Sequence, residues 1–251
     1  MSGSRSKNDR RRARQRPLHI INADYVRRSA DAVLAVDLTA VPPSHVNQFV
    51  VGWMRAAFEQ SRIIANLATY GHGYAAAPNR RAFWELALRL LWLGNMPQDQ
   101  RDPAVDTMLA HSRATESTTD THMRDMDLDY LVGLGSLDEF EHHPTSDPKL
   151  REQAKNLTAA VQGTELNTGV VYRLWREDST WAHATGYLAG MYAPENGTLM
   201  GEGTPPSIDH DLEAHRLTTA VIVVTAGFIL NGEGVPSDLA TAPSVAYFSV
   251  K

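Results

Sequence analysis

A nearly continuous apolar segment between Arg80 and Gly94 most constrains how this chain can fold. Its large apolar side chains are Phe83, Trp84, Leu86, Leu88, Leu90, Leu91, Trp92 and Leu93. Asn79, a residue type that caps helix N-termini, stands just before it. A helix that is apolar on most of its faces must be covered by neighbours on most of them. We therefore predict that this segment is the central helix of the protein.

Apolar residues recur at helical spacing in most of the remaining chain. The clearest pattern begins after Ser44, a predicted N-cap, and continues to about Tyr70. Further helices are predicted over 24–34, 102–113, 148–161, 165–176, 181–192 and 209–230. The Ser- and Thr-rich segment 115–129 is either a loop or a poorly determined helix. The expected fold class is all-α, a bundle of about seven or eight helices.

Three parts of the chain are expected to differ in structure. Residues 1–22 are predicted to form a disordered basic arm, because the first 16 contain seven basic residues, one acid and almost nothing apolar to bury. Residues 23–235 are predicted to form the all-helical domain. Residues 236–251 are predicted to form an extended C-terminal tail that covers the bundle.

The charge of the chain is divided between the arm and the body. Beyond residue 16 there are 17 basic and 28 acidic side chains, so the body is strongly acidic. The arm could tether a nucleic acid by neutralising phosphates and releasing counterions. It could equally act as a solubilising tail, or fold back onto the acidic body. Nucleic acid is therefore one expected partner.

Several classes of protein are excluded by what the sequence lacks. There are no cysteines, which excludes disulfides, thiolate nucleophiles, zinc fingers and iron–sulfur clusters. The longest apolar run, 217–230, is shorter than the roughly 20 residues that span a bilayer. No apolar stretch of the kind found in export signals follows the arm. We expect a soluble cytoplasmic protein with no membrane partner.

The central helix carries a charged stripe at Arg81, Glu85 and Arg89. These positions are four residues apart, so they lie on one face of the helix. Charges on a buried helix must be paired or must face a polar cavity. The stripe is either an anion-binding wall with two guanidiniums, or an ion-paired stripe at the edge of the bundle.

Arg176 and His183 match the Arg-x4–6-His spacing of the HEPN ribonuclease superfamily. The corresponding catalytic hypothesis uses His183 as the base or ribose contact and Arg176 as the phosphate stabiliser, without a metal and across a homodimer. Such spacings also arise by chance in a chain with this many Arg and His residues. The alternative is that His183 is a half-buried structural histidine.

Other residues carry a family resemblance. Arg81-x3-Glu85 on an apolar helix is followed by Val171-Tyr172-Arg173-Leu174 and then by Trp181-x-His183. Over roughly residues 45–230 this arrangement resembles an uncharacterised bacterial helical family, although Trp175 stands where that family shows Ser. The family is similar to HEPN proteins in its helical build, so the resemblance implies a HEPN-like fold and implies no activity.

Acidic and histidine-rich clusters occur at 120–129, 138–143 and 209–215. None contains a pair of histidines four residues apart flanking a Glu, the arrangement that seats zinc. We therefore predict no metal and no cofactor. Two function classes remain open: a binding or regulatory module for an anionic partner, and a metal-independent HEPN-type endoribonuclease of the toxin or phage-defence kind.

Overall fold

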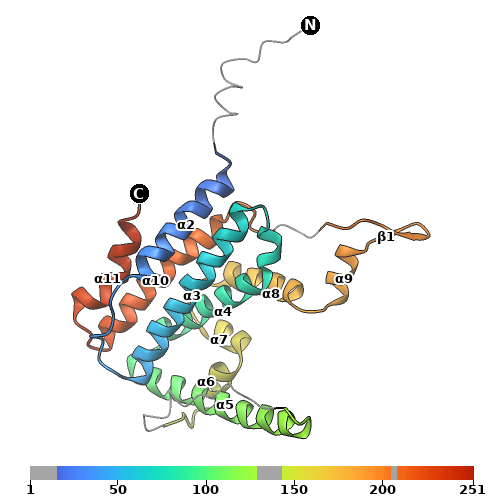
Figure 1. The fold of residues 1–251 in the computed structure, drawn as a ribbon. Helices are drawn as coiled ribbons and strands as arrows, with labels where there is room; N and C mark the ends of the chain where they lie inside the picture. Colours follow the sequence, from blue (N-terminus) through green and yellow to red (C-terminus); the bar gives the residue numbers. More distant parts are fainter. Residues whose placement is uncertain (1–15, 129–142, 205–207) are drawn as a thin grey trace.

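The computed structural model describes residues 16–128, 143–204 and 208–251, and this part of the chain is all-α (Figure 1). It contains ten α-helices, one 3-10 helix and one two-stranded hairpin. The helices are α2 (Leu18–Leu34), α3 (His45–Thr69), η1 (Gly73–Ala76), α4 (Ala77–Asn95), α5 (Gln98–Asp125), α6 (Pro148–Lys155), α7 (Leu157–Gly163), α8 (Gly169–Ala182), α9 (Gly186–Tyr192), α10 (Glu213–Gly232) and α11 (Ser237–Phe248). The strands are β1 (Glu195–Asn196) and β2 (Leu199–Met200).

The prediction of a central apolar helix is confirmed, because α4 packs against α3, α7, α8 and α10. Phe83, Trp84 and Leu90 on α4 are completely buried. One hydrophobic core runs from α2 through α4 to α11, and every described α-helix except α9 contributes buried residues to it. In Figure 1, α2, α10 and α11 lie side by side and cover one flank of this core.

Ser44 caps α3 as predicted. Its backbone is extended, and its Oγ accepts a hydrogen bond of 3.1 Å from the Asn47 amide. An amide in the first turn of a helix has no carbonyl partner within that helix, so the side-chain oxygen satisfies it. The periodic pattern after Ser44 therefore forms one helix of 25 residues.

The predicted boundary of the N-terminal arm at residue 22 is wrong. Helix α2 begins at Leu18, and Asn22 is buried near its first turns. The Asn22 side chain donates to the Asp211 carbonyl at 2.7 Å, a partner supplied by the far end of the chain. This tertiary bond helps to hold residues 18–22 in the helix. Residues 1–15 of the arm lie outside the described residues.

The prediction of an extended C-terminal tail over 236–251 is also wrong, because most of it forms α11. The aromatic and β-branched residues near Tyr247 favour strand locally. However, Ala240, Pro243 and Tyr247 repeat at steps of three and four, and all three are buried. Packing of this stripe against α10 and α2 outweighs the local preference and the proline inside the helix.

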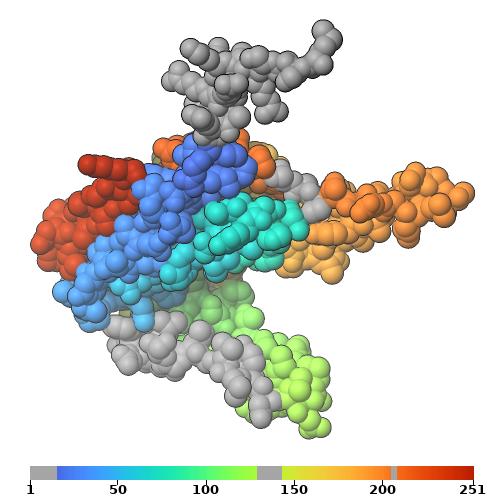
Figure 2. Space-filling model, turned by 45° about the horizontal axis from the view of Figure 1, so that its top comes forward, coloured from blue at the N-terminus to red at the C-terminus, as the bar shows by residue number. Residues whose placement is uncertain are grey.

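The polar segment after Arg113 is helical. Helix α5 continues to Asp125, and Ser and Thr hydroxyls along it donate to carbonyls four residues back. Residues 148–161, predicted as one helix, are divided at Asn156, whose side chain accepts from the Thr158 amide and so caps α7. The outer half of α5 and the β1–β2 hairpin both project from the body (Figure 2).

Helix α10 is the one described helix that is long and apolar enough to cross a membrane. Half of its apolar window is buried inside the fold, where it packs against α3, α4 and α11. Core helices of soluble proteins have the same composition, and the position of α10 is that of a core helix.

Candidate functional site

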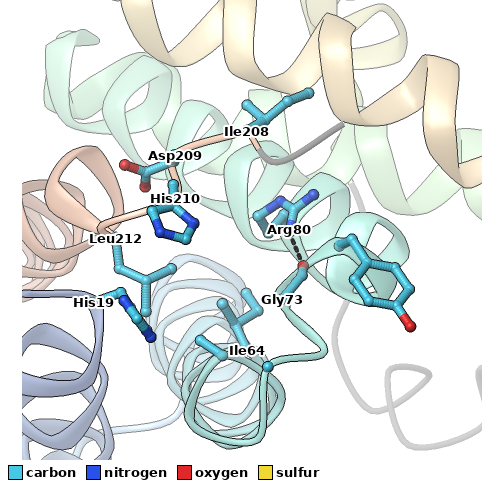
Figure 3. A pocket seen from close by; sticks show the side chains of 11 residues that line it. His19, Ile64, Gly73, Arg80, Ile208, Asp209, His210 and Leu212 are labelled. Atoms are coloured by element: carbon cyan, nitrogen blue, oxygen red, sulfur yellow. Dashed lines mark hydrogen bonds between the residues drawn. The ribbon is translucent and has the colours of Figure 1, made fainter. Parts of the chain in front are cut away.

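A pocket with a cavity volume of about 210 Å³ opens between the start of α2, the end of α3, η1 and the segment before α10 (Figure 3). Its lining combines apolar surface with two imidazoles and a guanidinium. The lining residues are His19, Ile64, Ala68, Gly71, Gly73, Tyr74, Arg80, Ile208, Asp209, His210 and Leu212.

The segment 208–212 at the rim of the pocket has an unusual backbone. Asp209 and Leu212 have φ angles of 49° and 54°, in the left-handed region that residues other than glycine rarely adopt. The Asp209 carboxylate accepts from the amides of Ala214 and His215 at 3.2 and 2.9 Å, so it caps α10. Such strain persists only where surrounding contacts hold it, and it is often found at functional sites.

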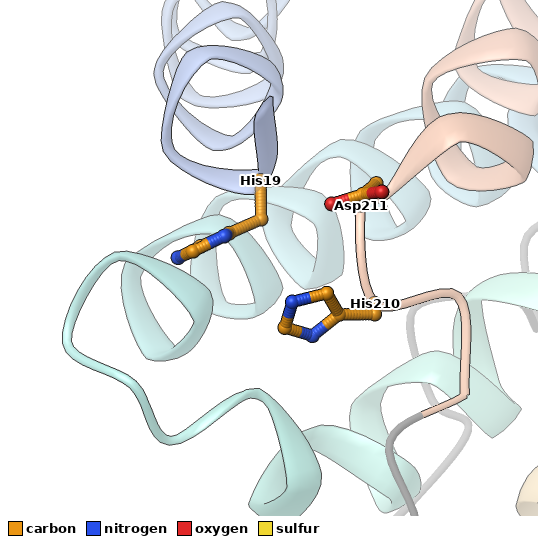
Figure 4. A group of neighbouring side chains, drawn as sticks. All are labelled: His19, His210 and Asp211. Carbon is orange, nitrogen blue, oxygen red and sulfur yellow. The ribbon is translucent and has the colours of Figure 1, made fainter. Parts of the chain in front are cut away.

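Two histidines and one aspartate gather at the rim (Figure 4). His19 comes from the first turn of α2, whereas His210 and Asp211 come from the segment before α10. One ligand atom from each lies within 4.8 Å of the others, and the two imidazole centroids are 5.0 Å apart. His210 is exposed, and the other two side chains are half-buried. We call these three residues the His19 cluster.

Buried Asn22 holds the two halves of the His19 cluster together. It lies one turn after His19 on α2, and its amide donates to the Asp211 carbonyl. Its carbonyl oxygen accepts from Arg216 on α10 at 3.2 Å. These two bonds join the first turns of α2 to the start of α10 beside the pocket.

A buried ion pair lies beneath the pocket. Arg80 on α4 contacts Asp178 on α8 through two nitrogens, with Nε 2.9 Å and Nη2 2.9 Å from Oδ1. Trp84 Nε1 donates to the other carboxylate oxygen at 2.8 Å, and Arg80 also donates to the Gly73 carbonyl. Burial raises the pKa of Asp178, while Arg80 and Trp84 oppose the shift. This network links α4 to α8 and positions Arg80 in the pocket wall.

His215 lies behind this network and is completely buried. Its Nε2 is 3.0 Å from Ser61 Oγ, and its ring centroid is 3.9 Å from that of Phe83. Burial, with a smaller contribution from the charge of Arg80, lowers the pKa of His215 to about 3. His215 is therefore a neutral core residue and not part of the open site.

Two residues of the predicted charged stripe meet on the outer side of α4. Arg81 lies 3.7 Å from Glu85 and donates from Nε to Ser179 Oγ at 3.2 Å. Glu85 accepts from Trp175 Nε1 on α8 at 3.3 Å. Both members of the Arg81–Glu85 pair are about one-third exposed, so this part of the stripe lies at the edge of the bundle.

Arg89, the third residue of the predicted stripe, has a different environment. It is buried, donates to the Gln153 carbonyl at 2.9 Å and lies 5.6 Å from the ring of Trp92. Burial lowers the pKa of Arg89. The structure therefore does not bring Arg89 to the surface shared by Arg81 and Glu85.

The structure does not join the predicted catalytic pair by any direct contact. Arg176 is exposed on α8, with its guanidinium 5.7 Å from the ring of Trp175. His183 is exposed at the C-terminal end of α8, seven residues or about 10 Å further along the axis. No hydrogen bond or ring contact connects the two side chains in the described part of the chain. Arg176 instead shares Trp175 with Arg81.

No family model, curated protein or solved structure matches the chain. The resemblance to a bacterial helical family and to HEPN proteins therefore stays a prediction.

The His19 cluster was not predicted from the sequence, although its segment 209–215 was singled out as acidic and histidine-rich. His19 had been assigned to the disordered arm, and nothing local pairs it with His210. The one available signal was the position of His19 among the apolar residues Leu18, Ile20 and Ile21, directly after Pro17. The contacts of Trp175 with two arginines were likewise not predicted from the sequence.

Proposed function

We propose that this protein is a non-catalytic binding module for single-stranded nucleic acid. The proposed contact is the Trp175 surface, which consists of Arg81, Tyr172, Trp175 and Arg176. One observation carries the proposal: the guanidiniums of Arg81 and Arg176 lie 5.9 and 5.7 Å from the centroid of the same indole ring. Arginines that flank an aromatic ring bind phosphates while a base stacks nearby.

Contacts within the protein hold the two rings of the Trp175 surface in place. Tyr172 and Trp175 are stacked, with centroids 5.6 Å apart and an interplanar angle of 27°. Glu85 accepts from the indole N–H, and Thr158 shares a hydrogen bond of 3.1 Å with the Tyr172 hydroxyl. Both rings are half-buried, so each keeps some area for contact with a base.

The charge distribution supports an anionic partner. Arg176 forms no ion pair with any carboxylate in the described ranges, and its charge is open to solvent. The seven basic residues among the first 16 add attraction that does not depend on sequence. The acidic body opposes such binding elsewhere, so contact should concentrate at the arm and the Trp175 surface.

Binding of a fluorescent oligonucleotide of about 20 nucleotides, measured by anisotropy at several salt concentrations, tests the proposal. Affinity should fall steeply as salt rises. Trp175→Ala should weaken binding about 5- to 100-fold, because base–aromatic stacking contributes about 1–3 kcal/mol. Arg176→Gln should weaken binding and reduce the salt slope by about one.

The matched control is Arg124→Gln, which removes one exposed arginine from α5, a helix that contributes no residue to the Trp175 surface. Equal affinities for Arg124→Gln and Trp175→Ala would contradict the proposal. The ribonuclease hypothesis predicts a different result. RNA would then be cleaved in the presence of a chelator, and His183→Ala would abolish the cleavage.

A further inference from the structure

We propose that the His19 cluster binds a first-row divalent metal ion of the zinc or cobalt class at the rim of the pocket. Two imidazoles and one carboxylate are a common ligand set for such ions. The three side chains come from two segments at opposite ends of the chain, and they extend toward the same space (Figure 4). None of them belongs to the Trp175 surface, so this inference is independent of the proposed function.

The spacing of the His19 cluster suits an ion of this size. Metal–ligand bonds of about 2.0–2.2 Å place the donor atoms of one ion at most about 4 Å apart. The three donor atoms lie within 4.8 Å of one another without an ion. The observed spacing is therefore only slightly wider than the spacing that one ion requires.

The backbone around the cluster is already held in place. Asn22 fixes Asp211 to α2 through the 2.7 Å hydrogen bond to its carbonyl. Asp209 and Leu212 keep left-handed backbone angles on either side of the two ligands from this segment. Asp209 also anchors the segment to α10 through two amide hydrogen bonds.

The proposed ion would keep at least one coordination position for a non-protein ligand. Three protein ligands leave a tetrahedral ion one position short, which is the pattern of open zinc sites. His19 and His210 both line the pocket, so a non-protein ligand could reach the ion from a cavity of about 210 Å³. A cavity of this volume holds several waters or a small ligand.

The test uses full-length, tag-free protein stripped with a chelator and titrated with Co²⁺. We expect one equivalent of Co²⁺ per chain, with visible d–d absorption that Zn²⁺ abolishes by competition. His19→Ala, His210→Ala and Asp211→Asn should each weaken Co²⁺ binding at least tenfold. The matched control is His72→Ala, because His72 is exposed next to the pocket but lies outside the cluster. This control should bind Co²⁺ like the wild type.

A second readout separates loss of the site from loss of the fold. A ligand that binds only the folded protein raises the melting temperature, by about 5–10 °C at a hundredfold excess over its dissociation constant. This rise should occur for wild type and His72→Ala and be absent for His210→Ala. The melting temperature of each variant without Co²⁺ shows whether the substitution itself affects the fold. Failure of wild type to bind Co²⁺, or binding that survives both histidine substitutions, overturns the proposal.

Discussion

At the scale of single residues, His215 shows how burial favours the neutral form of an ionisable side chain. Ser61 Oγ donates to the Ala57 carbonyl at 2.9 Å, so it accepts a hydrogen bond from His215 Nε2. The proton of the neutral ring is thus on Nε2. The other ring nitrogen, Nδ1, has no hydrogen-bond partner among the described residues. An unpaired acceptor of this kind costs less than a buried positive charge would.

His215 should make the stability of the protein depend on pH. The unfolded chain takes up a proton on this residue near pH 6.5, whereas the folded protein does so only near its lowered pKa of about 3. As pH falls from about 6.5 toward 3, the free energy of unfolding should therefore decrease by about 1.4 kcal/mol per unit from this residue alone. Urea unfolding of wild type and His215→Gln at several pH values measures the difference in slope.

The control for this measurement is His183→Gln, which replaces an exposed histidine and should keep the wild-type slope. Identical slopes for wild type and His215→Gln would show that the buried imidazole does not resist protonation.

At the scale of secondary structure elements, α11 depends on one face of its own sequence. Tyr247 is 2% exposed and its hydroxyl lies 2.9 Å from Thr219 Oγ1 on α10, whereas the adjacent Phe248 is 60% exposed. Tyr247→Ala should reduce the free energy of unfolding by about 3–5 kcal/mol, because it leaves a cavity in the core. Phe248→Ala should change it by no more than about 0.5 kcal/mol.

Chemical denaturation of the two variants measures this contrast. Because the substitutions are adjacent in one helix, they share any effect of helix propensity. Similar losses of stability would mean that α11 is not docked through Tyr247.

At the scale of the whole molecule, the described helices divide between a packed body and projecting parts. The buried residues of α5 lie at or before Leu109, and beyond this point α5 extends away from the core (Figure 1). Among the described residues, its outer half has no buried side chain, and its Thr hydroxyls donate to carbonyls of the same helix. Helices α4 and α10, by contrast, have buried residues along their whole length.

Amide hydrogen exchange should reflect this division. Residues 112–125 should exchange much faster than α4 and α10, because opening of an exposed helical end requires no disruption of the core. Mass spectrometry of peptides from the three segments provides the measurement. Equal protection of 112–125 and α4 would require tertiary contacts for the outer half of α5.

The local sequence pattern predicted the structure correctly where that structure depends only on residues close in sequence. The apolar residues that recur every three or four positions after Ser44 predicted α3, and Ser44 predicted its cap, because both effects act within one or two turns. The same reasoning failed for residues 18–22 and for α11. In those segments a distant partner, the Asp211 carbonyl or the face of α10, stabilises a helix that local preference does not favour.

The all-helical class and the central position of α4 were thus determined by the sequence alone, since periodicity and apolar content are properties of adjacent residues. Only the tertiary structure decided which side chains meet. Arg80 finds Asp178 across 98 positions, and His19 approaches His210 from the other end of the chain. Such encounters depend on how whole helices pack, and spacing within one segment carries no information about that packing.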